Sequence, residues 1–398
     1  MANTLAVIDM VTRESLRIAH EKLSFIGTID RQYDDSFAKT GAKTGSTLRV
    51  RNPNKYTRRQ GSRVMDVQDQ NETTQTITLA TQDGVDMRFN SAELTLSIDE
   101  LSRRYIEPAI TTLVAGIEAD FLAYCTKATY NVAGAAGTAV TTLDPMLKAR
   151  AKLNQGLAPK GDRYVQLDSL TSASLVNGVT GYFNPSNAIS EQYREGMIAR
   201  TAMADFYENE KVWTMTNGSD VACTLNTYTV IEGDTDLSVT GFATPTVGMV
   251  FTIAGVYDVN PETKQVYGNL KQFTVTSGST ASSINISPPI YSSASGALQN
   301  VSAMPTTTAA LTFVGGASTA YVQPLMYHKE AFQFVTADLP IMDDAAKCVR
   351  RTQDGLSLRV WQASDIRNDE LLMRIDILYG MAALRPEWAS RIIGSAAA

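Results

Sequence analysis

A long amphipathic helix predicted for residues 97–127 constrains the fold more than any other feature of the sequence. Ser97 and Glu100 fit a capping box, in which each side chain accepts a hydrogen bond from the other residue's backbone N–H. The helix would span about 45 Å at ~1.5 Å per residue. Pro108 lies inside it, so we expect a kink or a restart there. The apolar stripe recurs at steps of three and four, at Ile98, Leu101, Tyr105, Ala109, Leu113, Ile117, Phe121 and Tyr124.

Strand-like alternation precedes this helix. Ile77 with Leu79, and then residues 85–89, alternate apolar and polar side chains around a turn predicted at Gln82-Asp-Gly84. We expect an antiparallel hairpin here, followed by a third short strand at Leu94 and Leu96. Near the N-terminus, residues 12–24 predict a short amphipathic helix. It could pack on its own domain or act as an arm that docks on a partner subunit.

Residues 41–76 predict a long two-stranded excursion with too little apolar content to form a core of its own. Residues 48–50 suggest one strand and residues 64–67 a second. The excursion could be a solvated loop, but its segregated charges favour ordering against another subunit. Six basic residues come first and three acidic residues follow: Arg49, Arg51, Lys55, Arg58, Arg59 and Arg63, and then Asp66, Asp69 and Glu72.

A change of composition marks the second half of the chain. Only eight charged residues occur between Thr216 and Ala320, and residues 272–328 contain none. Short alternating runs punctuated by Gly and Pro predict an all-β barrel inserted into an α/β host. The expected strands are residues 228–231, 249–253, 273–276, 284–286 and 311–314. In the host we expect a small-residue loop at 131–142, helices at 144–156, 169–179 and 186–199, and strands at 164–167, 356–361 and 371–378.

Composition excludes several classes of protein. The 398 residues carry 35 Lys plus Arg against 41 Asp plus Glu, a net charge of −6 that does not suit a dedicated nucleic-acid binder. The three cysteines form no CxxC pair, which excludes a disulfide scaffold or zinc-finger array and suits a reducing compartment. We identify neither a secretory signal at residues 1–10 nor a membrane-spanning stretch, and we expect a soluble protein made inside the cell.

Motifs for catalysis or cofactor binding are weak. His20 and His328 are the only histidines, and no G-x-S-x-G motif accompanies them. Residues 41–46 lack the order of a phosphate-binding loop. Residues 233–236 and Asp343-Asp344 do not complete a calcium loop. We therefore expect no enzyme activity, cofactor or metal, although two distant carboxylates acting on a glycoside are not excluded by sequence.

Several strings resemble the major capsid proteins of tailed phages, in the coat-protein branch typified by the Salmonella phage P22. They are Ala2-Asn-Thr-Leu5, residues 8–13, Arg31-Gln-Tyr-Asp-Asp35, Gly84-Val-Asp-Met87, Ser91-Ala-Glu-Leu-Thr95, Ile106-Glu-Pro-Ala109, Gln192-Tyr-Arg-Glu-Gly-Met197, Asp205-Phe-Tyr-Glu-Asn209, residues 250–256 and residues 327–332. The resemblance implies an α+β fold of the Hong Kong 97 type, with an extended loop, a peripheral domain with a spine helix, an axial domain and an inserted barrel.

Mapped onto this chain, the resemblance implies an N-terminal arm at 1–40, the extended loop at 41–76 and the peripheral domain at 77–130. The axial domain would begin at 131–215, the barrel would occupy 216–320, and residues 321–398 would return to the peripheral and axial domains. Such proteins assemble as pentamers and hexamers into an icosahedral head that encloses double-stranded DNA. The implied partners are a scaffolding protein supplied in trans and a portal, and the implied location is the virion, after synthesis and assembly in the host cytoplasm.

The nine charged residues of the excursion are our candidate intersubunit residues, and we expect only weak contact with packaged DNA. Two other classes stay open. A tail or baseplate polymer would usually be β-rich throughout, which the long helix does not favour. A hydrolase with a β accessory domain would need a catalytic motif that the sequence does not offer.

Overall fold

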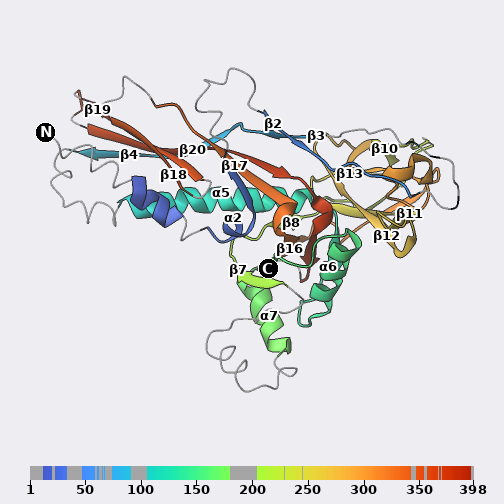
Figure 1. Ribbon diagram of the computed structural model, residues 1–398. Helices are drawn as coiled ribbons and strands as arrows, with labels where there is room; N and C mark the ends of the chain where they lie inside the picture. The colour runs from blue at the N-terminus through green and yellow to red at the C-terminus, as the bar shows by residue number, and fades with distance from the viewer. Residues whose placement is uncertain are drawn as a thin grey trace. The chain divides into compact units, whose positions relative to one another are not determined.

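The chain forms two compact units in this computed structural model, and each is described by itself (Figure 1). Unit 1 comprises Met1–Val50, Thr74–Phe121 and Phe332–Ala382, and unit 2 comprises Arg51–Thr73, Leu122–Ala331 and Ala383–Ala398. The structure describes residues 12–19, 23–33, 47–58, 61, 65, 67, 74–90, 105–179, 204–227, 229–243, 245–341, 347–353, 356–365, 367–368 and 370–395.

A mixed sheet forms the base of unit 1. Its strand order is β1 (Asp30–Tyr33), β17 (Phe332–Ala337), β20 (Glu370–Ala383), β19 (Leu356–Asp365) and β18 (Lys347–Gln353). A further strand, β4 (Thr81–Asn90), pairs antiparallel along β20. The predicted C-terminal strands are confirmed as the antiparallel pair β19 and β20.

Helix α5 (Glu107–Ala128) lies along the strands of this sheet in Figure 1. Pro108 falls in the first turn of α5, directly after residues 105–106, which are π-helical, so the proline lies where the helix changes type. Within unit 1, the Phe121 ring packs 5.3 Å from Phe25 and 5.5 Å from Phe334 between ring centroids. By length and composition α5 could cross a membrane, but half of it is buried, as in the core helix of a globular protein. The capping box at 97–100 lies outside the described residues.

Residues 12–19 and 23–33, within the expected N-terminal arm, pack on their own unit. Residues 12–19 are helical, with Leu16, Ile18 and Ala19 buried, and α2 (Phe25–Thr28) follows. The Glu118 carboxylate on α5 is fully buried and accepts hydrogen bonds from the Ser24 hydroxyl (3.0 Å) and the Phe25 backbone N–H.

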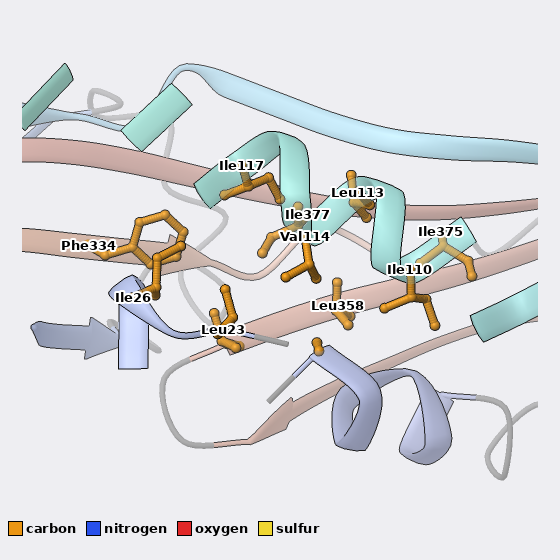
Figure 2. A pocket seen from close by; sticks show the side chains of 12 residues that line it. Leu23, Ile26, Ile110, Leu113, Val114, Ile117, Phe334, Leu358, Ile375 and Ile377 are labelled. Atoms are coloured by element: carbon orange, nitrogen blue, oxygen red, sulfur yellow. The ribbon is translucent and has the colours of Figure 1, made fainter. Parts of the chain in front are cut away.

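A small apolar pocket lies between the arm, α5 and the sheet of unit 1. In Figure 2, Ile110 and Val114 of α5 face Leu358 of β19, with Ile375 and Ile377 of β20 beside them. Every side chain that lines the pocket is apolar. The pocket is therefore a gap in the core, with no side-chain hydrogen-bonding group to orient a ligand.

A five-stranded sheet organises the α/β part of unit 2. Its order is β5 (Val132–Gly134), β21 (Ala389–Ile393), β16 (Leu325–His328), β6 (Arg163–Leu167) and β7 (Asp205–Glu208). The predicted helices are confirmed as α6 (Asp144–Gln155), with proline in its first turn and Gly156 as its C-cap, and α7 (Ser169–Val179). The short 3-10 turns η4 (Lys329–Ala331) and η5 (Pro386–Trp388) complete this part.

A closed six-stranded barrel occupies the charge-poor stretch. Two short strands lead into and out of it, β8 (Thr214–Thr216) and β15 (Ala320–Val322), and they pair with Thr216 opposite Ala320. The barrel core is apolar, with Phe251 and Phe313 in ring contact at 5.0 Å. The barrel order is β10 (Asp234–Thr240), β13 (Ser283–Ile290), β12 (Val266–Val275), β11 (Val250–Val259), β14 (Ala310–Phe313) and β9 (Ala222–Leu225). The 3-10 turn η3 (Ser293–Leu298) follows β13.

Some local predictions were wrong. The expected turn at Gln82-Asp-Gly84 lies inside β4, and β3 (Thr74–Thr78) pairs with β2 (Thr47–Arg51) while β4 pairs with β20. Long-range partners with apolar faces replaced the local hairpin, because strand pairing is decided by packing rather than by turn residues alone. A strand, β5, occupies part of the expected loop at 131–142, and no strand is assigned to the described residues 229–231 or to Met65 and Val67. The predicted helix at 186–199 and the strand at Leu94 and Leu96 lie outside the described residues.

Candidate assembly surface

The predicted basic segment is an exposed run that continues from β2. Of the nine candidate residues, the structure describes four, and all four are exposed: Arg49, Arg51, Lys55 and Arg58. The other five lie outside the described residues: Arg59, Arg63, Asp66, Asp69 and Glu72. The acidic half of the excursion at 41–76 lies outside the described residues, so its contrast with the basic half is known from the sequence alone. Large apolar side chains are exposed on the same excursion, with Tyr56 at 58%, Met65 at 80% and Val67 at 77%.

The barrel supports this segment from within unit 2. A Cβ built on Gly296 of η3 would lie 3.8 Å from the Thr57 side chain, so the two segments are in contact range. Burial, together with the positive charge of nearby Lys55, lowers the pKa of Lys264. Residues 55–57 therefore run past Lys264 and Gly296. Sequence inspection missed both residues, because no local signal links positions more than 200 residues apart.

Side chains from two loops between barrel strands hold η3 at both ends. At its start, the Glu232 carboxylate accepts hydrogen bonds from the Ser292 backbone N–H (2.8 Å), the Ser292 hydroxyl and the Ser295 hydroxyl (2.7 Å). At its end, the Lys264 ammonium donates to the carbonyl oxygens of Ala297 (2.8 Å) and Gln299 (3.3 Å). Burial alone would raise the pKa of Glu232, but the hydrogen bonds from Ser292 and Ser295 lower it.

Polar contacts, together with a small apolar cluster of Val132, Val250, Tyr321 and Ile393, join the barrel to the α/β part of unit 2. The Gln272 side chain on β12 pairs twice with the Val132 backbone, accepting from its N–H (2.9 Å) and donating to its carbonyl (3.1 Å). Next to it, Arg391 of β21 is fully buried. Its guanidinium donates to the Gly248 carbonyl (2.6 Å) of the barrel and the Lys127 carbonyl (3.0 Å) at the end of α5. Burial lowers the pKa of Arg391 to about 9, so it stays protonated at neutral pH.

The residues considered for chemistry have structural contacts. His328 is buried, its Nδ1 accepts a hydrogen bond from the Glu330 N–H (3.3 Å), and its ring packs edge-on against Trp388. Burial raises the pKa of Cys125 and, with Asp220 nearby, raises the pKa of Cys223 to about 12, so neither is a reactive thiolate. Asp234 accepts a hydrogen bond from the Ile231 N–H (2.8 Å) within its own turn.

Within the part of the chain that the structure describes, no group of three or more His, Cys, Asp or Glu side chains is arranged to hold a metal ion. His20, residues 41–46 and Asp343-Asp344 lie outside the described residues. The described residues instead form an exposed basic and apolar segment, with Thr57 next to Gly296 of the barrel turn η3.

Comparison with known proteins identifies a matching family and solved structures that align with this chain. A family model described as "P22 coat protein - gene protein 5" matches residues 75–394. A solved structure from Mycobacterium phage Che8 aligns with a TM-score of 0.50 at 10% identity, over 93% of this chain and 90% of that chain, which indicates a shared fold. A capsid structure of the cyanophage P-SCSP1u aligns with a TM-score of 0.49 at 10% identity, over 93% and 87% of the two chains. The CUS-3 coat protein I-domain is 26% identical over 25% of this chain and 98% of its own, with a TM-score of 0.20. No curated protein sequence matches this chain.

Proposed function

This chain belongs to the P22 coat protein family and is a phage major capsid protein, and we propose that it assembles as pentamers and hexamers into an icosahedral head around double-stranded DNA. The family match over residues 75–394 carries this proposal. A subunit that builds a closed shell needs several weak contacts rather than one strong one, since weak contacts allow errors to reverse during assembly.

The architecture supports a Hong Kong 97-type assignment of the parts. The sheet of unit 1 with α5 would be the peripheral domain with its spine helix, at 77–130 and in the C-terminal return. The five-stranded sheet with α6 and α7 would be the axial domain, beginning at 131–215. The closed barrel between β8 and β15 would be the insertion at 216–320, and residues 1–40 and 41–76 would be the arm and extended loop.

Electrostatics suggests which partners this subunit contacts strongly. A net charge of −6 limits adhesion of packaged DNA to the shell, because phosphates are bound by cationic surfaces. The basic segment at 49–63 is instead proposed to meet a neighbouring subunit, where charge pairs set register more than affinity. A scaffolding protein and a portal complete the proposed partners, and assembly would take place in the host cytoplasm.

A structural role without catalysis is proposed for the whole chain. It draws support from His328, Cys125 and Cys223, which are buried. A tail or baseplate polymer is disfavoured by the family match.

Sedimentation velocity of the purified chain, with negative-stain microscopy of the fast-sedimenting fraction, tests the function. Closed shells, or spirals and tubes of ring-shaped capsomers, are the expected products, with or without the cognate scaffolding protein. A chain that stays monomeric in the presence of that scaffold would contradict the proposal.

A further inference from the structure

Arg391 on β21 is a fully buried cation whose hydrogen bonds go only to neutral groups. One terminal nitrogen of its guanidinium donates to the Gly248 carbonyl (2.6 Å) and the Gln323 amide oxygen (3.1 Å). The other donates to the Lys127 carbonyl (3.0 Å) and the Thr274 hydroxyl (3.2 Å). Arg391 therefore forms no ion pair within the part of the chain that the structure describes.

Stability alone does not explain a buried arginine at this place. Taking a charge out of water without an opposite charge is unfavourable, and an apolar side chain of similar volume fills such a site at a lower cost. Hydrogen bonds differ from apolar contacts because they are satisfied over a narrow range of distances and angles. What Arg391 supplies, and an apolar residue would not, is a fixed geometry among its four partners.

Those four partners belong to separate segments of unit 2. Gly248 precedes β11 and Thr274 lies on β12, so both belong to the barrel. Lys127 lies near the end of α5, and Gln323 follows the stem strand β15. Because Arg391 itself belongs to the five-stranded sheet, one side chain links the barrel, its stem and the α/β part.

The Thr274 hydroxyl completes this link on the barrel side. It is fully buried and donates to the Lys127 carbonyl (3.1 Å) while it accepts from Arg391. The Lys127 carbonyl therefore receives hydrogen bonds from both β12 and β21. Gly248, with φ +96°, makes the close approach possible, since a Cβ there would lie 3.1 Å from the Lys127 Cγ.

The apolar contact at this junction is small and has no preferred direction. It consists of Val132, Val250, Tyr321 and Ile393. Hydrophobic burial depends on the area removed from water rather than on direction, so this cluster alone would tolerate small rotations of the barrel. Apart from the pairing of Gln272 with Val132, the Arg391 hydrogen bonds are the directional contacts described at this place.

We propose that Arg391 is a positioning residue that fixes the orientation of the barrel on the α/β part of unit 2, with Thr274 as its partner on the barrel. Without either side chain, the barrel would keep its fold, because its core cluster includes neither residue, but it would rotate about the stem strands β8 and β15. This inference concerns the single subunit and does not depend on assembly into a shell.

Distances between two spin labels on the full-length chain test this role. Lys148→Cys on α6 and Val266→Cys on β12 place the labels at exposed positions of the α/β part and the barrel. Cys348→Ser removes the half-buried thiol, and the remaining cysteines, Cys125 and Cys223, are buried. An excess of unlabelled chain suppresses distances between different subunits. The background protein should give one narrow distance distribution.

Two substitutions in this background remove the link. Arg391→Met and, separately, Thr274→Val should broaden or split the distance distribution, while circular dichroism still shows a folded chain with a cooperative melt. Thr126→Val is the matched control, because Thr126 is also fully buried but its hydroxyl donates to the Leu122 carbonyl within α5 (2.7 Å). The control should keep the narrow distribution.

The distance distribution separates positioning from a general role in stability. A lower melting midpoint with an unchanged distribution in the Thr274 variant would overturn the inference, because the hydroxyl would then only stabilise the fold. Equal broadening in the Thr126 control would also overturn it. If Arg391→Met fails to fold, the Thr274 variant decides. Failure of the wild type to assemble would contradict the proposed function and leave this result unaffected.

Discussion

Two ion pairs on β20 lie two residues apart and differ in burial. Asp376 pairs with Arg359 of β19, directly opposite in register, and the two side chains are 2% and 4% exposed. Arg374 pairs with Asp86 of β4, also directly opposite, and these side chains are 48% and 65% exposed. The buried pair gains further hydrogen bonds, from Gln82 to Asp376 (2.7 Å) and from Arg359 to the Pro340 carbonyl (2.9 Å).

Gly84 makes room for the buried pair. It lies opposite Asp376 on β4, and a Cβ built there would lie 2.9 Å from the Ile375 carbonyl oxygen and 3.0 Å from the Asp376 Cβ. Any larger residue would push the strands apart at the point where the carboxylate is held. The glycine that the sequence suggested as a turn residue is therefore a site of close approach between strands.

Removing one partner of the buried pair should destabilise unit 1. Arg359→Met leaves the Asp376 carboxylate buried and uncompensated, and we expect a loss of about 3–5 kcal/mol in the free energy of unfolding. Arg374→Met should cost only about 0.2–1 kcal/mol, because the exposed pair is screened by water. Urea unfolding of both variants measures the difference. Adding Asp376→Leu to Arg359→Met should recover part of the loss, and equal effects of the two single substitutions would contradict this account.

His328 should make stability fall in mild acid. Burial lowers its pKa from the ordinary 6.5, Glu330 and Asp162 oppose that shift, and Arg163 and Arg385 reinforce it. The unfolded chain then binds the proton more readily than the folded chain. The stability that neutral His328 contributes is therefore complete above about pH 6.5. It is lost as the pH falls through the lower pKa that His328 has in the folded state.

Urea midpoints measured between about pH 7.5 and 5 test this pH dependence. The wild type should lose stability more steeply with falling pH than His328→Gln. Identical slopes for the wild type and His328→Gln would show that the acid sensitivity comes from other groups.

At the scale of elements, the barrel has the features of a domain that folds alone. It is closed, so it has no open sheet edge, and its core of aromatic and aliphatic side chains lies within residues 215–313. The stem strands β8 and β15 bring its two ends together, with Thr216 opposite Ala320. The two connections between the barrel and the α/β part of unit 2 therefore lie side by side.

Residues 216–320 expressed alone should give a β-type circular dichroism spectrum and a cooperative thermal transition. The physical reason is that every buried residue of the barrel core except Met215 lies within this segment. The junction with the host consists of the polar contacts of Gln272 and Arg391 and a small apolar cluster of Val132, Val250, Tyr321 and Ile393. A random-coil spectrum would show that the barrel depends on its host. Phe251→Ala in the same segment should abolish the cooperative transition, because it removes a fully buried ring.

At the scale of the whole molecule, we propose that the charge distribution favours self-association. The described basic residues Arg49, Arg51, Lys55 and Arg58 are exposed in one segment, while the chain as a whole is acidic. Association driven by such a patch weakens with salt, because exposed charges are screened beyond ~10 Å at 0.1 M ionic strength.

Reversing the basic charge should impair shells without unfolding the subunit. Arg58→Glu combined with Arg59→Glu is expected to leave the melting midpoint near that of the wild type and to reduce shell formation in sedimentation and microscopy. Lys148→Glu combined with Lys160→Glu changes the net charge equally at exposed positions elsewhere and should still assemble. Normal shells from the Arg58 and Arg59 variant would show that the basic segment is not an interface.

Local periodicity and capping chemistry determined the helices. Asp144-Pro145 and Gly156 bound α6, and the predicted limits of α7 are those observed, because helix signals depend on residues within a few positions of each other. The charge-poor composition likewise predicted a barrel, since six strands of alternating apolar residues share one core. Family strings in the sequence predicted the capsid role that the family match supports.

Only the tertiary structure decided which strands pair and what the extended segment contacts. The pairing of β4 with β20 joins residues about 290 positions apart, and Thr57 lies next to Gly296, 239 positions away in sequence. The guanidinium of Arg391 likewise donates hydrogen bonds to the backbone carbonyls of both Lys127 and Gly248, which are far apart in sequence. Such contacts are chosen by burial and hydrogen-bond satisfaction among distant segments, and these quantities exist only once the chain is folded.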